Sequence, residues 1–234
     1  MLAYLVIAFF VCALLAAAFF IYKNTIGKKR RSTLKEDYEK EAERHERSGR
    51  LISAAAIYEG QLRNKGKAAE LYEKGADYRR AAALYDMLGM PDKAREMYEK
   101  DGDMESAAVV AMLQGNYEEA ARLYDSAGKK IDAAIMLDKA GRRMAAVRIY
   151  REAGEYKKAS QLLEEEGMPK EAAEMFGIFL RDKQVEEHTE DFYAYALKLA
   201  HAGETQAAIE IFRMIDIASP FFRDVKDRLA SLIS

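Results

Sequence analysis

A 13-residue repeat is the feature that most constrains how this 234-residue chain can fold. Segments of one pattern follow each other at that spacing, and they begin at Arg63, Ala76, Gly89, Gly102, Gly115, Gly128, Gly141, Gly154 and Gly167. A related segment begins at Gly49, with one residue extra before the next. A short fixed period indicates a fold that is made by stacking copies of one unit.

Each unit has the pattern of a short helix with a tight turn. In the unit that begins at Gly115, the small residues Ala120 and Ala121 precede the pair Leu123-Tyr124. The spacings of three and four residues place these side chains on one helix face. The recurring Gly suits a helix end with positive φ. A helix of about ten residues is too short to be stable alone, so its stability must come from stacking.

Alternate units are not equivalent. An aromatic residue at the tenth place recurs in every second unit, at Tyr72, Tyr98, Tyr124, Tyr150 and Phe176. The units between them carry Tyr85, Ala111, Leu137 and Leu163 at that place. This alternation predicts a 26-residue helical hairpin that contributes one helix to each of two layers.

The G-x(4)-A-A-x-x-Y pattern resembles the tetratricopeptide-like (TPR-like) superfamily over roughly residues 48 to 217. The unit of the true tetratricopeptide is longer, and the 26-residue unit of this chain is similar to the compact hairpins of trafficking-coat solenoids. The resemblance implies an all-α fold, an α-solenoid, and binding of other proteins. We expect short repeats over 49–180, a polar break over 181–189, and a TPR-like hairpin with a capping helix over 190–234. Ser219 and Pro220 suit the start of that capping helix.

The first 22 residues carry no charge, and as a helix they would span about 33 Å, enough for a hydrocarbon core of roughly 30 Å. We therefore predict a single transmembrane helix over 1–22 and a basic juxtamembrane segment over 23–31. The basic residues Lys23, Lys28, Lys29, Arg30 and Arg31 place the repeat domain in the cytoplasm and the N-terminus outside. The alternative is a cleaved signal peptide, but the segment lacks a positive n-region and is long for one.

A charged segment over 32–48 follows, with almost no apolar stripe. Such a helix is typical of a solvated spacer between membrane and domain.

We find no catalytic or metal-binding pattern. His45, His188 and His201 are scattered and lack zinc-type spacing, and Cys12 is the one cysteine. Asp101, Asp103 and Glu105 match only part of a calcium loop. The net charge of −2 argues against a general nucleic-acid binder. We expect no enzyme activity, no cofactor, no metal and no small-molecule substrate.

The candidate partner-binding residues are Tyr78, Met104, Tyr117 and Tyr156, each two places after a turn residue. One interpretation is that they cover the hairpin edges. The other is that they anchor a partner, because aromatic residues dominate interface hot spots.

The sequence thus predicts a membrane-anchored scaffold or adaptor that binds proteins at the cytoplasmic face, as an accessory to a membrane machine such as a secretion or motility apparatus. The alternative is an envelope assembly factor whose repeat domain lies on the extracytoplasmic side.

Overall fold

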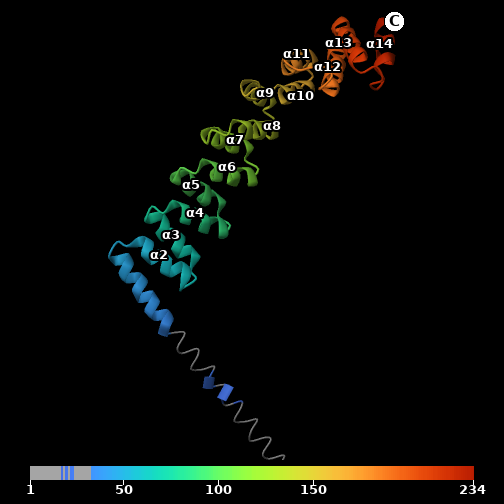
Figure 1. Ribbon diagram of the computed structural model, residues 1–234. Coiled ribbons are helices and arrows are strands. Elements are labelled where there is room, and N and C mark those ends of the chain that lie inside the picture. The colour runs from blue at the N-terminus through green and yellow to red at the C-terminus, as the bar shows by residue number, and fades with distance from the viewer. Residues whose placement is uncertain (1–16, 18, 21, 24–32) are drawn as a thin grey trace, which may run out of the picture. The chain divides into compact units, whose positions relative to one another are not determined.

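The computed structural model describes residues 17, 19, 20, 22, 23 and 33–234. The chain divides into two compact units, Met1–Gly102 and Asp103–Ser234. Within the described residues, every regular element is a helix (Figure 1). The all-α fold predicted from the sequence is therefore confirmed for the described residues.

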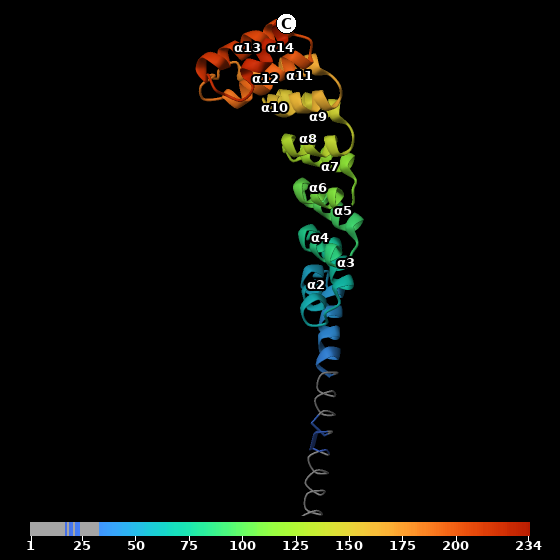
Figure 2. The ribbon, with the colours of Figure 1, turned by 90° about the vertical axis from the view of Figure 1, so that its right-hand side faces the viewer.

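Within each unit, the helices follow one another in chain order (Figures 1 and 2). The first unit holds a helix over residues 33–47 and then α2 (Leu51–Gly60), α3 (Lys65–Lys74), α4 (Tyr78–Met87) and α5 (Pro91–Asp101). The second unit holds α6 (Met104–Leu113), α7 (Tyr117–Ser126), α8 (Lys130–Lys139), α9 (Arg143–Glu152), α10 (Tyr156–Glu165), α11 (Pro169–Leu180), α12 (Thr189–His201), α13 (Thr205–Ala218) and α14 (Val225–Ile233). From α3 to α11, the helix starts keep the 13-residue spacing of the sequence repeat without exception.

The turn after each helix from α2 to α10 holds one residue in the left-handed conformation. At the end of α6, Gly115 has φ 78°, its N–H donates to the Met112 carbonyl, and the Asn116 N–H donates to the Ala111 carbonyl. This Schellman pattern satisfies carbonyls that the helix end leaves open. The same place is taken by Ala76 (φ 60°) and Arg63 (φ 51°), the two unit starts that lack Gly.

The paired small residues form the centre of the packing between successive helices. Ala120 and Ala121 are 0% and 4% exposed, and the corresponding pairs in α3, α4, α6, α8 and α11 are similarly buried. One exception is Ser160, which is fully buried and donates its hydroxyl to the Ala172 carbonyl at 2.7 Å. Because these side chains are small, they allow adjacent helix backbones to approach closely.

Tyrosines at the tenth place link neighbouring helices in the first unit. The Tyr72 hydroxyl donates to Glu59 on α2 at 3.0 Å, and the Tyr85 hydroxyl donates to Glu73 on α3 at 2.6 Å. Glu46, on the preceding helix, is the carboxylate that acts on the Tyr58 hydroxyl of α2. Burial first, and then these carboxylates, raise the pKa of Tyr58 and of Tyr85 above the ordinary value.

The spacer prediction for 32–48 needs a correction. The second half of the helix over 33–47 packs on the first unit, with Ala42 fully buried and Glu46 paired to Lys67 on α3 at 3.1 Å. The one fully buried side chain of this helix is the small Ala42, and there is no apolar stripe. That is why hydrophobic periodicity did not reveal this packing.

The start of the capping helix also differs from expectation. Ser219 and Pro220 lie in a loop, and α14 begins only at Val225. Tyr193 on α12 contacts Phe222 with ring centroids 5.8 Å apart, and its hydroxyl donates to Asp224. These contacts hold residues 222–224 against α12, so the helix begins after them.

The predicted transmembrane segment 1–22 lies almost wholly outside the described residues, as do Lys28, Lys29, Arg30 and Arg31. Lys23 is described and exposed. Among the described residues, no helix is both long enough and apolar enough to cross a membrane.

Candidate functional site

The four residues singled out in the sequence are half-buried, and each stands at the first position of its helix. Tyr78 packs against the core of the first unit, and Tyr156 packs against that of the second. Within the second unit, Met104 and Tyr156 begin α6 and α10, whereas Tyr117 begins α7. Successive helices alternate in direction, so Tyr117 lies at the opposite edge of this unit from the other two. Within the second unit, the structure therefore does not gather Met104, Tyr117 and Tyr156 into one site, and the role of all four residues in binding stays a prediction.

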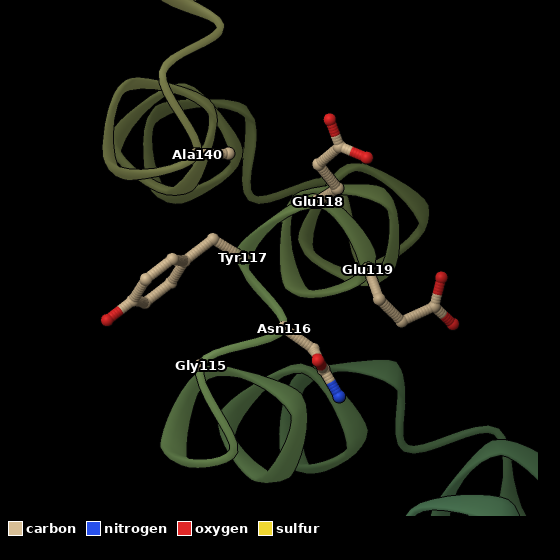
Figure 3. A pocket seen from close by; sticks show the side chains of 6 residues that line it. All are labelled: Gly115, Asn116, Tyr117, Glu118, Glu119 and Ala140. Carbon is tan, nitrogen blue, oxygen red and sulfur yellow. The ribbon is translucent and has the colours of Figure 1, made fainter.

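A shallow hollow of about 390 Å³ lies beside Tyr117, between the start of α7 and the end of α8 (Figure 3). The Tyr117 ring points away from the carboxylates of Glu118 and Glu119, and Ala140 stands opposite on the neighbouring helix. The ammonium of Lys139 lies 5.8 Å from the centre of the Tyr117 ring. The hollow is open and holds few convergent groups, so we do not assign it a ligand.

A larger groove of about 530 Å³ crosses α7, α8 and α9. Its apolar floor is made by Ala121, Ala133, Leu137 and Ile149. The volume falls in the range of about 300–1,000 Å³ that is usual for ligand-binding clefts. Small residues on α7 and α8 leave this space open, and so the groove is a direct consequence of the repeat pattern.

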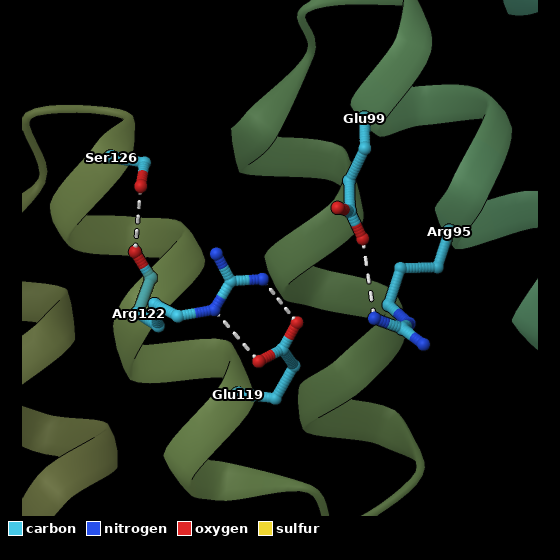
Figure 4. A network of polar contacts seen from close by, with 5 residues as sticks. All are labelled: Arg95, Glu99, Glu119, Arg122 and Ser126. Carbon is cyan, nitrogen blue, oxygen red and sulfur yellow. Dashed lines mark hydrogen bonds and ion pairs between the residues drawn. The ribbon is translucent and has the colours of Figure 1, made fainter.

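Charged side chains line the rim of this groove. Two of them are held by ion pairs: Glu118 accepts from Arg142 at 2.7 Å, and Arg122 donates to Glu119 (Figure 4). The pair with Glu118 raises the pKa of Arg142 above its ordinary value. Arg142 precedes α9 and Glu118 lies in the first turn of α7, so this ion pair joins the starts of these two helices.

Four other rim residues have no side-chain hydrogen bond or ion pair with any described residue. They are Asp125, Lys130, Arg148 and Glu152, and all four are exposed. Sequence reasoning missed them. The one available signal was that Arg122 and Arg148 occupy the same place in alternate units of the repeat.

The histidines and acidic residues do not form a metal site in the described part of the chain, where no three candidate metal ligands come together. Asp103 instead caps α6, because its carboxylate accepts from the Ser106 N–H at 3.0 Å and from the Ser106 hydroxyl at 2.8 Å. His188 precedes α12, and His201 lies exposed in its last turn. The Nδ1 atom of His45 is buried without a hydrogen-bond partner in the described residues.

No protein-family model matches the sequence, and no curated protein matches it. Among solved structures, the chain is similar to a chain in the structure of Naa15/Naa10 bound to HypK-THB, with 14% identity and a TM-score of 0.52. That match covers 87% of this chain and 39% of the other, so this chain spans well under half of the longer protein. The likeness shows a shared fold.

Two further matches have lower TM-scores. YrrB, a TPR protein with an unusual peptide-binding site, has 21% identity and a TM-score of 0.31, over 81% of this chain and 89% of that one. A tetratricopeptide repeat protein from Parabacteroides merdae ATCC 43184 has 13% identity and a TM-score of 0.31, over 86% of this chain and 100% of that one.

Proposed function

We propose that this chain is a protein-binding scaffold. The observation that carries the proposal is the groove across α7, α8 and α9, which combines an apolar floor with four unpaired charges. Apolar floors supply binding energy, and placed charges supply orientation and selectivity. Helical-repeat proteins commonly use such extended surfaces to bind other proteins.

The binding test is a pull-down with the 234-residue chain, kept in mild detergent because of its apolar segment. The variant Ala133→Arg places a long charged side chain on the groove floor, and Arg151→Glu, on α9 but not among the residues that line the groove, is the matched control. We expect specific partners to be retained by the control and lost by Ala133→Arg. A chain that captures nothing above background contradicts the scaffold proposal.

We further propose that residues 1–22 anchor the scaffold, with the repeat domain in the cytoplasm. The support is the uncharged length of this segment and the basic residues that follow it, Lys23, Lys28, Lys29, Arg30 and Arg31. The test is a reporter fused after Ser234 that is active on only one side of the membrane. Activity outside the cytoplasm would instead favour the envelope assembly factor, and release of the chain by carbonate washing would contradict the anchor.

An accessory role in a membrane machine, such as a secretion or motility apparatus, extends this proposal. Proximity labelling in the native membrane tests it. We expect labelled proteins to be dominated by subunits of one membrane assembly, whereas labelling of unrelated abundant proteins alone would contradict the role.

A further inference from the structure

The groove across α7, α8 and α9 has an internal order. Arg142 and Glu118 join the start of α9 to the start of α7, and α8 runs back between them. Asp125, Lys130 and Glu152 therefore lie at one end of the groove. Arg122, Ala133 and Arg148 lie in its middle. Leu137 lies toward the other end, near the paired Glu118.

The middle of the groove favours an acidic group. Arg148 is exposed and unpaired, and its guanidinium offers a planar set of donors that suits a carboxylate. Arg122 stands at the equivalent place on α7, although Glu119 already holds it. A carboxylate that enters the middle of the groove would thus meet one unpaired guanidinium beside a second that is already neutralised.

The end of the groove that holds Asp125, Lys130 and Glu152 favours a basic group. Asp125 and Glu152 bring two unpaired carboxylates, against the single ammonium of Lys130. Two helix C-termini, those of α7 and α9, also meet there against one helix N-terminus, that of α8. Helix C-termini favour cations, so the backbone adds to the side-chain preference.

The two ends and the middle of the groove are three successive levels. Their spacing matches that of alternate residues in an extended chain. Neighbouring levels are about four residues apart on a helix, as from Leu137 to Ala133, and this corresponds to about 6 Å at roughly 1.5 Å per residue. An extended peptide advances about 6.6 Å over two residues, and its alternate side chains point to the same side. Side chains at every second position of such a peptide would reach successive levels.

We propose, resting on the protein-binding function above, that the groove binds an extended segment of a partner protein with an apolar, an acidic and a basic side chain at alternate positions. The apolar side chain packs near Leu137, the acidic one meets Arg148, and the basic one meets Asp125 and Glu152.

The test is selection from a random heptapeptide library displayed on phage, with the immobilised 234-residue chain as bait. Enriched peptides are expected to hold the apolar–x–acidic–x–basic order in one chain direction. The variant Arg148→Glu should bind such a peptide about tenfold more weakly than the unmodified chain does. The substitution removes one charge-assisted contact and places a like charge beside the acidic side chain of the peptide. Arg151→Glu, in the next turn of α9 and outside the groove lining, should leave affinity unchanged.

Exchanging two charges on α9 tests whether the order of charges in the groove selects the peptide, or whether substitutions there simply weaken binding. The double variant Arg148→Glu with Glu152→Arg keeps the composition of α9, and neither side chain has a hydrogen-bond or ion-pair partner to lose among the described residues. We expect it to select peptides in which the acidic and basic positions are exchanged. No enrichment, or the same motif from both baits, would overturn the proposal. The scaffold proposal would still stand if the pull-down retained partners that Ala133→Arg loses.

Discussion

At the scale of single residues, the repeat depends on a left-handed residue in the turn after each helix from α2 to α10. Gly fills this place from Gly89 to Gly167 at φ between 68° and 81°, whereas Ala76 and Arg63 adopt it with a side chain. A left-handed residue with a Cβ costs roughly 1–2 kcal/mol. The turn pattern is therefore strong enough to impose this conformation on two residues that disfavour it.

Ala76→Gly should stabilise the first unit by about 0.5–1 kcal/mol, because relief of the left-handed strain exceeds the added entropy of the unfolded chain. The reverse change, Gly115→Ala, should destabilise the second unit by about 1 kcal/mol. No atom lies within 4 Å of the added Cβ at Gly115, so backbone strain alone sets that cost. Urea unfolding measures both, and a loss of stability in Ala76→Gly contradicts the argument.

The tyrosine–glutamate bonds are the second feature at this scale. Burial and then Glu73 raise the pKa of Tyr85, so the folded chain holds the phenolic proton more tightly than the unfolded chain does. A group with a raised pKa contributes stability that is complete below its unfolded pKa, near 10, and is lost as the pH rises toward its folded pKa.

Tyr85→Phe should cost about 1–2 kcal/mol at pH 8, because it removes a bond to a charged carboxylate. Above pH 10 the unmodified chain loses stability through Tyr85 and the variant does not, so the difference between them should narrow. Urea unfolding at pH 8, 10 and 11 measures this. A difference that widens with pH would show that the sign is wrong.

At the scale of the helix, the two adjacent small residues have different surroundings. Ala120 is fully enclosed between helices, whereas Ala121, although only 4% exposed, lines the groove. The sequence treats both as helix-contact positions. Only the assembled helices show that the second one also faces open space.

Ala120→Leu should destabilise the second unit by about 1–3 kcal/mol, because added methyl groups overpack a closed contact. Ala121→Leu should cost less, because its side chain can extend into the groove, and it should weaken partner binding instead. Thermal unfolding compares the two variants. Equal losses of stability would mean that both positions are equally closed.

At the scale of the whole molecule, the 26-residue hairpin is the unit that can be added or removed. Within the second unit, the tenth place of the repeat is held by Tyr124 on α7 and Tyr150 on α9, and by Ala111 on α6 and Leu137 on α8. Deletion of one helix would move every later helix to the other layer, where its residue at the tenth place of the repeat does not match its new neighbours. Loss of two helices preserves the alternation.

Deletion of residues 115–140 should therefore leave a folded chain with a lower melting temperature, since repeat stability is roughly a sum over units and interfaces. Deletion of residues 115–127 removes fewer residues but should cost more stability and broaden the unfolding transition. Circular dichroism on heating compares them. A smaller loss for the single-helix deletion contradicts the two-layer argument.

The sequence alone determined the helices, their spacing and their turns, because a 13-residue period with Gly and paired Ala is local information. The repeat spacing also places Ala76 and Arg63 at turn positions, although neither is Gly. Sequence reasoning misplaced the start of α14, since the contacts of Tyr193 with Phe222 and Asp224 join residues that are far apart in the chain.

Only the tertiary structure decided where the groove lies. Asp125, Lys130 and Arg148 come from three helices and carry no pattern that marks them in the chain. They converge because α7 and α9 lie parallel with α8 between them. Tyr117 and Tyr156, both at helix starts in the second unit, are separated for the same reason: successive helices reverse direction, so the two residues lie at opposite edges of that unit.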